Sequence, residues 1–332
     1  MQKGCILMKI PINAEELFGM KFIADIREDD HVIGHYLCRF KQSLKTRVGK
    51  TYYSLKLQDK TGKVDAKVWE LTKDIQDFNE GDMIKIDATA TSYQNGMQLK
   101  INKLRRSQEG EYVLEDYIPT TEKNVADMYG KIVAIVNSIE NPHLKTLLEN
   151  ILIKNEAQAA ALKSHSAAKA MHHSYMGGLL EHILAVAEIC DFMASRYKYV
   201  NRDLLLTGAL LHDIGKIYEL SPMPQNEYTD DGQMLGHIII GVEMVVVETM
   251  KIENFPHQLA SLVKHLIISH HGEYEYGSPK LPYTAEAMLL HYADNMDAKL
   301  KTIEEVLDKD TSPGPWAGYH NALARYIRKS DF

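Results

Sequence analysis

The sequence predicts two domains of different fold class, an N-terminal all-β barrel followed by a C-terminal all-α bundle. Residues 20–107 consist of short runs with strand-like alternation that are separated by turn signals. Residues 121–332 instead follow the helical period, with polar loops between apolar segments. The polar segment 108–120 is predicted to link them, and 332 residues are enough for two domains.

The charges divide at the same place. Residues 1–110 hold 19 Lys+Arg and 15 Asp+Glu, a net charge of +4, which leaves 19 and 30 for the remainder, a net charge of −11. A basic N-terminal part and an acidic C-terminal part indicate two units with different functions. An acidic unit that handles a polyanion needs metal cations to do so.

Cysteine usage and hydropathy argue against a secreted disulfide scaffold and against a transmembrane helix. The three cysteines, Cys5, Cys38 and Cys190, are odd in number and widely spaced, which favours a reducing compartment. No segment approaches ~20 uninterrupted apolar residues, the length that spans a bilayer. The N-terminus also lacks the long apolar core of a secretory signal. We therefore expect a cytoplasmic protein with no membrane partner.

Turn signals organise the N-terminal domain. Asp59-Lys60-Thr61-Gly62 and Asn95-Gly96 each separate two alternating runs, a pattern typical of β-hairpins. A short helix is expected over residues 70–78, between the third and fourth strands of the barrel. Such a pattern predicts a small Greek-key barrel of the OB type. The expected strands cover residues 22–26, 32–40, 52–57, 64–69, 83–93 and 97–104.

Segment 39–50 is predicted to be a basic loop of this barrel, because it contains no acidic residue. Such a loop can track a phosphate backbone while aromatic rings stack on bases. For any single aromatic residue, filling of the core is the favoured interpretation. For the whole domain, charge and fold type together favour binding of single-stranded RNA, with single-stranded DNA as a second candidate. The basic residues are Arg39, Lys41, Lys45, Arg47 and Lys50, and the aromatic ones are Tyr52, Tyr53, Trp69 and Tyr93.

The helical domain is predicted from helical periodicity over residues 122–139, 142–153 and 155–162, and no strand pair is expected after them. Histidine and aspartate residues recur near helix ends or on apolar faces throughout this half. A single His-Asp dipeptide carries little weight, since short motifs arise by chance. Helices that converge in a bundle can gather such groups into one metal site. The residues are His172, His173, His182, His212, Asp213, His237, His270, His271 and Asp294.

These residues carry a family resemblance. Gly-Gly-Leu-Leu-Glu-His at 177–182, His-Asp-Ile-Gly-Lys at 212–216 and Ala-Asp-Asn-Met-Asp at 293–297 resemble the motifs of the HD-domain superfamily of metal-dependent phosphohydrolases. With the basic barrel before it, the chain is similar to the YhaM-type 3′-to-5′ exoribonucleases, whose domain order is the same.

The resemblance implies a two-metal site. Asp213 would bridge the ions, with His182, His212 and Asp294 completing one ligand set and His237 and His270 the other. Such mixed ligands suit Mn²⁺, Fe²⁺, Co²⁺, Ni²⁺ or Zn²⁺ better than Mg²⁺, and we expect Mn²⁺. Two ions roughly 3.5–4 Å apart generate a hydroxide and clamp the reacting oxygens.

The resemblance also suggests substrate contacts. Lys216 would balance charge on the phosphate oxygens. His172 and His173 contact the scissile phosphate or base, or only cap a loop. His271 binds metal, contacts phosphate, or only flanks His270. Asp297 follows Asp294 by one helical turn and is a candidate to support a ligand.

The sequence thus favours a metal-dependent 3′-to-5′ exoribonuclease, with the polarity implied by the resemblance alone. A phosphohydrolase acting on nucleotides or cyclic dinucleotides is the second hypothesis. A non-catalytic nucleic-acid-binding regulator is the third, and the complete set of ligands argues against it. Residues 313–332 are predicted to form a packed last helix with a basic face; contact with substrate, or with a second copy in a homo-oligomer, is the alternative.

Overall fold

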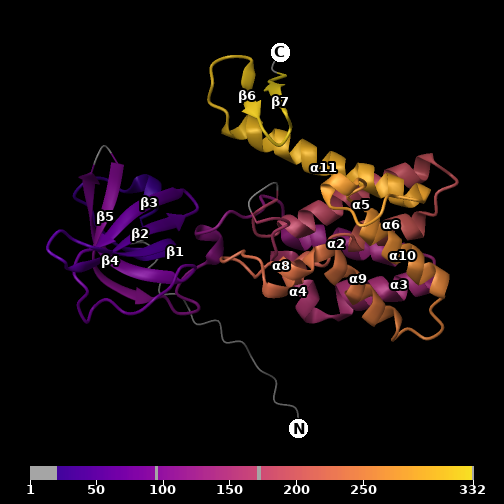
Figure 1. The fold of residues 1–332 in the computed structure, drawn as a ribbon, viewed down its shortest axis with the longest axis horizontal. Coiled ribbons are helices and arrows are strands. Elements are labelled where there is room, and N and C mark those ends of the chain that lie inside the picture. The colour runs from indigo at the N-terminus through magenta and orange to yellow at the C-terminus, as the bar shows by residue number, and fades with distance from the viewer. Residues whose placement is uncertain (1–20, 94–95, 170–172, 331–332) are drawn as a thin grey trace, which may run out of the picture. The chain divides into compact units, whose positions relative to one another are not determined.

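The computed structural model describes residues 21–93, 96–169 and 173–330. They form two compact units, which divide after Pro119 (Figure 1). The all-β barrel and the helical region that the sequence predicts are both present. No helix among the described residues is long and apolar enough to cross a membrane.

The first unit is a closed barrel in which the strands follow the order β1-β2-β3-β5-β4. Its neighbours pair antiparallel except β3 and β5, which run parallel. Inward-facing residues alternate with outward-facing ones along β3 and β4, as the period of two requires. The strands are β1 (His31–Lys45), β2 (Thr51–Asp59), β3 (Gly62–Val68), β4 (Met83–Tyr93) and β5 (Gly96–Arg106).

Two expected elements of the barrel are wrong. The predicted strand 22–26 is a short 3₁₀ helix, Ile23–Asp25, since the Asp59 carboxylate accepts a hydrogen bond from the Ile23 backbone N–H (2.6 Å). The predicted helix 70–78 does not form. Its backbone instead bonds to β5, where Gln76 N–H donates to the Leu104 carbonyl at 2.9 Å.

The segment after β5 packs on the barrel. Residues Leu114–Asp116 form a 3₁₀ helix, and Tyr117 and Ile118 behind it are buried. The Gln58 side-chain amide donates to the Tyr117 carbonyl at 3.0 Å. Residues 108–119, which the sequence assigns to a linker, therefore add a buried edge to the first unit.

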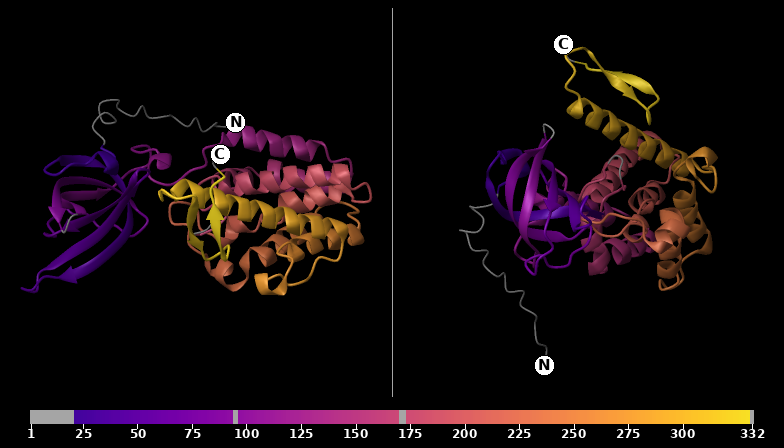
Figure 2. Two further views of the ribbon diagram at one scale, coloured as in Figure 1. Left: turned by 90° about the horizontal axis from the view of Figure 1, so that it is seen from above. Right: turned by 60° about the vertical axis from the view of Figure 1, so that its left-hand side comes forward.

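The second unit is built around two buried helices, α5 (Gly178–Arg196) and α6 (Arg202–Leu211). Every residue from Leu204 to Leu211 in α6 is buried, which explains its continuous apolar sequence. Asparagine side chains cap several helix starts (Asn124, Asn141, Asn155 and Asn201). The surrounding helices are α2 (Val125–Asn137), α3 (Pro142–Glu149), α4 (Glu156–Ser164), α7 (Lys216–Glu219), α8 (Asp230–Met234), α9 (Gly236–Thr249), α10 (His257–Ser269) and α11 (Ala285–Lys309) (Figures 1 and 2).

The C-terminal stretch is a β-hairpin, so the predicted last helix and the expected absence of strand pairs are both wrong. Strands β6 (Trp316–His320) and β7 (Arg325–Arg328) pair antiparallel beside α11 (Figure 2). The side chains of Ala317, Leu323 and Ile327 are buried against the C-terminal half of that helix. This tertiary packing stabilises the hairpin, and no local sequence pattern predicts it.

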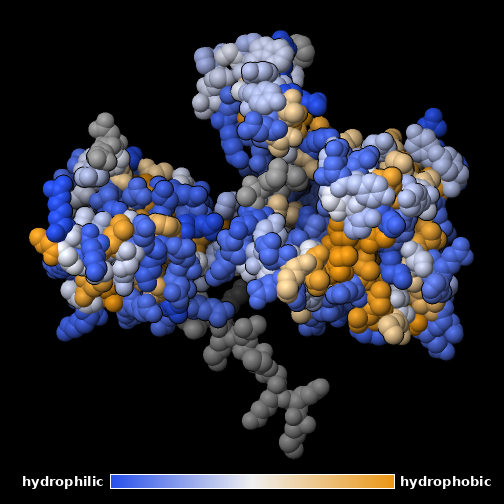
Figure 3. Space-filling model, in the orientation of Figure 1, coloured by the Kyte–Doolittle hydropathy of each residue, from blue (hydrophilic) through white to orange (hydrophobic). Residues whose placement is uncertain are grey.

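Apolar surface is unevenly distributed. Figure 3 shows hydrophilic residues over most of the visible face and an apolar area on the helical unit. Helix α9 contributes the exposed side chains of Ile239 and Val247, and Met250 directly after the helix is exposed as well, so this helix is apolar on more than its buried face.

Candidate metal centre

Two glycines allow the helices that carry the predicted ligands to meet. A Cβ on Gly215 would lie 2.1 Å from the His237 carbonyl oxygen, so only glycine lets the turn after Asp213 touch the start of α9. A Cβ on Gly178 would lie 2.1 Å from the His173 carbonyl oxygen, where the preceding loop packs on α5. The glycines of both motifs therefore serve close backbone approach.

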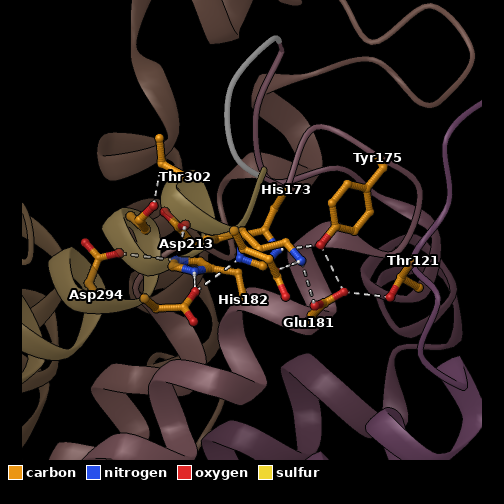
Figure 4. A network of polar contacts seen from close by, with 12 residues as sticks. Thr121, His173, Tyr175, Glu181, His182, Asp213, Asp294 and Thr302 are labelled. Carbon is orange, nitrogen blue, oxygen red and sulfur yellow. Dashed lines mark hydrogen bonds and ion pairs between the residues drawn. The ribbon is translucent and has the colours of Figure 1, made fainter. Parts of the chain in front are cut away.

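Asp213 lies at the centre of the cluster, with 2% of its surface exposed. Its Oδ2 atom is 3.4 Å from His182 Nε2 and 3.5 Å from His212 Nε2. His182 Nε2 is also 3.2 Å from His212 Nε2 and 3.2 Å from Asp294 Oδ1. Ligand atoms about 2.1 Å from a metal lie about 3.0 Å apart at octahedral angles and about 3.4 Å apart at tetrahedral angles. These spacings fit a shared ion (Figure 4).

The other carboxylate oxygen of Asp213 faces a second group of imidazoles. Its Oδ1 atom is 3.5 Å from His237 Nε2 and 3.7 Å from His270 Nε2. One nitrogen each of His237, His270 and His271 lie within 4.8 Å of one another. Asp213 Oδ1 and His237 Nε2 are buried and have no hydrogen-bond partner among the described residues. Leaving such atoms unsatisfied costs about 1–3 kcal/mol each, and a cation between them would remove that cost.

The imidazoles of both groups are fixed in one orientation. Each donates its Nδ1–H to an acceptor outside the cluster, and a backbone carbonyl or a carboxylate can only accept. Nδ1 therefore carries a proton, and Nε2 points inward, as in metal-ligating histidines. The acceptors are the Ala209 carbonyl for His212 (2.9 Å), Ile267 for His270 (2.7 Å), Tyr276 for His271 (2.9 Å), Glu219 Oε1 for His237 (3.0 Å) and Asp297 Oδ2 for His182 (2.7 Å).

The local field favours a positive charge inside the site. Burial alone would lower the pKa of His182, but its hydrogen bonds to Asp294 and Asp297 raise the pKa to about 10. Burial would raise the pKa of Asp213, yet the Lys216 ammonium and His212 hold it well below its usual value. Without a metal, a proton on His182 thus takes the place of a cation.

A pocket of about 540 Å³ opens onto the cluster and is lined by Asp213, Lys216, His270, His271 and Asp294, among others. This volume lies within the range of small-molecule sites. Lys216 Nζ is 2.6 Å from Asp213 Oδ2. Burial would lower the pKa of Lys216, but Asp213 raises it, so the side chain stays cationic at the pocket.

Comparison with known proteins agrees with this geometry. The chain is 35% identical over 270 residues to the 3′-5′ exoribonuclease YhaM of Geobacillus sp. (strain WCH70), an alignment that spans 80% of this chain and 81% of the relative. This chain belongs to the YhaM family of 3′-5′ exoribonucleases. Residues 179–299 match the HD domain model, and residues 39–106 match a model described as an OB-fold nucleic acid binding domain.

The barrel also has a likeness among solved structures. The second OB-fold domain of replication protein A from Methanococcus maripaludis is 15% identical, with a TM-score of 0.23 over 27% of this chain and 95% of that chain.

Of the predicted substrate contacts on this YhaM-family chain, His172 lies outside the described residues, and His271 and Lys216 line the pocket. His173 is buried behind the site, where its Nε2 is 3.2 Å from Asp297 Oδ2 and its Nδ1 is 2.9 Å from the Tyr175 hydroxyl. His173 is not among the residues that line the pocket, and its contacts support Asp297 instead.

The basic residues of the barrel occupy two different settings, because Arg39 and Lys41 lie within β1 rather than in a loop. Lys41 Nζ donates to the Phe78 carbonyl (2.5 Å) and lies 4.7 Å from the Tyr53 ring centre, contacts that stabilise the barrel. Lys45 ends β1 and Arg47 follows it in the turn, and both are exposed.

The ring stacking that the barrel does show is internal. Tyr52 and Trp69 stack with ring centres 4.7 Å apart, and 39% of Trp69 remains exposed.

Sequence reasoning named Asp297, which accepts from His182 Nδ1 at 2.7 Å, but it missed two other carboxylates around the ligands. Glu219 accepts hydrogen bonds from both the backbone N–H and Nδ1 of His237, each at 3.0 Å. Glu181 accepts from the hydroxyls of Thr121 (2.6 Å) and Tyr175 (3.0 Å), which continues the network outward from His173 (Figure 4). A metal-ligating imidazole needs a hydrogen-bond acceptor for its second nitrogen, so such partners could be expected. The sequence does not show which carboxylate accepts from which imidazole.

Proposed function

We propose that this chain is a metal-dependent 3′-5′ exoribonuclease that removes nucleotides from the 3′ end of single-stranded RNA. The observation that carries the proposal is the position of Asp213, whose two oxygens face two separate groups of inward-pointing imidazoles. A carboxylate in that position suits a bridge between two cations. The family of the chain supplies the polarity and the substrate class.

The proposed ligand sets share Asp213. His182, His212 and Asp294 complete one set, and His237 and His270 complete the other, with His271 as an additional ligand. The mixed imidazole and carboxylate ligands suit Mn²⁺, Fe²⁺, Co²⁺, Ni²⁺ or Zn²⁺, and Mn²⁺ is our choice among them because Asp213 and Asp294 add carboxylate oxygens to the imidazoles. Such ions, when bound, lower the pKa of water and polarise the phosphodiester.

Residues around these ligands orient them and meet the substrate. Asp297 and Glu219 hold His182 and His237 with their Nε2 atoms inward. The Lys216 ammonium faces the pocket, where it would offset negative charge that develops on the non-bridging phosphate oxygens.

The barrel would hold the RNA chain. Lys45 and Arg47 are exposed at the β1–β2 turn, which corresponds to a loop that binds oligonucleotides in OB folds. Phosphate contacts from such residues make binding weaken as salt rises, and single-stranded DNA is a second candidate ligand. We place the activity in the cytoplasm, in accord with the free thiols of the buried Cys38 and Cys190.

The proposal is tested with 5′-labelled single-stranded RNA, purified protein and Mn²⁺. We expect a ladder that shortens from the 3′ end, no ladder with Asp213→Ala, and an unchanged ladder with Asp231→Ala, which alters an exposed carboxylate. Intact RNA with the wild type, or an active Asp213→Ala protein, would overturn the proposal. Turnover of nucleotides or cyclic dinucleotides without RNA shortening would favour the second hypothesis instead.

A further inference from the structure

The C-terminal hairpin is fixed to the helix that carries Asp294. Helix α11 contains that residue in its first half, and its second half packs on the hairpin through Ile303, Val306 and Leu307. The base of the hairpin is closed by Lys329, whose Nζ is 2.5 Å from Asp310 Oδ2. The hairpin is therefore held in a defined position relative to the metal centre.

The turn of the hairpin reaches the metal pocket. Ala322 and Leu323, between β6 and β7, line the same 540 Å³ pocket as Asp213 and Lys216. Lys299 of α11 lies in that wall as well. A chain that enters the pocket on this side must pass the hairpin.

One face of the hairpin presents aromatic rings to solvent. Because Ile327 points toward α11, its neighbours Tyr326 and Arg328 point away from that helix. Tyr326 pairs with Tyr319, and Arg328 pairs with Trp316, so all four lie on the outward face. Tyr319 is 53% exposed, Trp316 54% and Tyr326 63%.

The charge of this segment matches a polyanion. Residues 311–330 contain no acidic residue, and Arg325 and Arg328 are exposed, while the third basic residue, Lys329, pairs with Asp310. The rings of Tyr319 and Tyr326 are 5.3 Å apart in an edge-to-face arrangement, which leaves ring faces open to solvent. Exposed rings beside arginines are the combination on which single-stranded bases stack.

We propose that this outward face binds the single-stranded RNA segment that leads into the metal pocket. The rings of Tyr319 and Tyr326 stack on bases upstream of the scissile phosphate, and the Arg328 guanidinium contacts the backbone. The hairpin thus positions the substrate, while the turn at Ala322 and Leu323 forms one wall of the pocket. The inference rests on the proposed exoribonuclease function.

The test compares a long single-stranded RNA with a dinucleotide, which is short enough to occupy the pocket alone. In the Tyr319→Ala/Tyr326→Ala double variant, KM for the long RNA should rise by about tenfold or more, the effect of losing base stacking. Its kcat and its turnover of the dinucleotide should match the wild type. The Tyr319→Phe/Tyr326→Phe variant keeps the rings and should keep the wild-type KM. Tyr199→Ala removes a tyrosine that is 78% exposed outside the hairpin and serves as the control.

The outcomes separate the two proposals. If the wild type shortens RNA and the double alanine variant has an unchanged KM, the hairpin does not bind substrate and the exoribonuclease function stands. Equal losses on both substrates would make the hairpin a structural element only, which also overturns the inference. A wild type that leaves RNA intact would overturn the function and the inference together.

Discussion

Replacing Asp213 with asparagine should greatly reduce the stabilisation of the helical unit by divalent metal. This buried side chain presents Oδ2 to His182 and His212 and Oδ1 to His237 and His270. Asparagine preserves the size of the side chain but replaces one oxygen with an NH₂ group, which cannot act as a ligand. Both proposed ion sites lose an anionic ligand in this single change.

The size of the effect follows from linkage. A ligand that binds only the folded state adds about 2.7 kcal/mol per site when its concentration is 100 times its Kd. For a domain of 150–250 residues, 1 kcal/mol shifts Tm by about 2–4 °C. The helical unit spans Thr120–Phe332 and so falls within that size range. Metal should therefore raise the Tm of the wild type by about 5–11 °C per occupied site, and should raise that of Asp213→Asn far less.

Without metal, the Asp213→Asn protein should already be less stable than the wild type. The experiment must separate this loss of stability from the loss of metal binding. Lys216 Nζ is 2.6 Å from Asp213 Oδ2, and the Lys216 side chain is only 17% exposed. Removing one partner of a buried ion pair costs about 3–5 kcal/mol. Adding Lys216→Met to Asp213→Asn removes the unpaired ammonium, so the double variant should recover much of the metal-free Tm while remaining unresponsive to metal.

Far-UV circular dichroism during heating measures these shifts, with Mn²⁺ added to protein that has been stripped with a chelator. An Asp213→Asn protein whose Tm rises with Mn²⁺ as much as that of the wild type would refute the bridging role. A double variant that regains metal-dependent stabilisation would show that Lys216, rather than the lost carboxylate, had blocked binding.

Two further predictions concern single side chains. Lys216→Met should slow RNA hydrolysis by about 10²–10³-fold, the effect of removing one group that stabilises developing charge, while the rise of Tm with Mn²⁺ persists; loss of that rise would assign Lys216 to metal binding instead. In the barrel, the Arg105 guanidinium lowers the pKa of Glu111 from 4.5 to about 2, so this carboxylate stabilises the fold above pH 4.5 and loses its contribution as the pH falls toward 2. Because the two side chains are 33% and 27% exposed, Glu111→Gln should lower the free energy of unfolding at pH 7 by only about 1 kcal/mol after screening. The difference should shrink at acid pH in denaturant titrations, and a difference independent of pH would contradict the ion-pair explanation.

The sequence predicted those parts of the fold whose signals are local. Alternation of apolar residues and the turn at residues 59–62 define β2 and β3, because each strand buries one face along its own length. The conformation of residues 22–26 and 70–78 instead depends on hydrogen bonds to Asp59 and Leu104, which are distant in the chain. Tertiary contacts of that kind override local propensity.

The candidate site shows the same division. The motifs identified residues that the fold brings together around Asp213, since those positions lie at helix ends or on buried helix faces. Glu219 escaped notice because nothing in the sequence pairs it with His237. For His173 the sequence left open contact with the substrate or a role in capping a loop, and the structure shows it in contact with Asp297 and Tyr175. Adjacency to a motif does not tell in which direction a side chain points.

The fixed orientation of the imidazoles links metal binding to folding. With Nδ1–H committed to outer acceptors, the Nε2 atoms of several histidines converge on one cluster at the pocket. Within this cluster His237 Nε2 and Asp213 Oδ1 have no hydrogen-bond partner among the described residues. Because folding already fixes the ligands, binding of an ion requires little further ordering of side chains. The free-energy cost of that ordering is instead part of the free energy of folding. Acceptors such as Asp297 and Glu219 are then as necessary as the ligands, because without them a proton can move to Nε2 and occupy the coordinating lone pair.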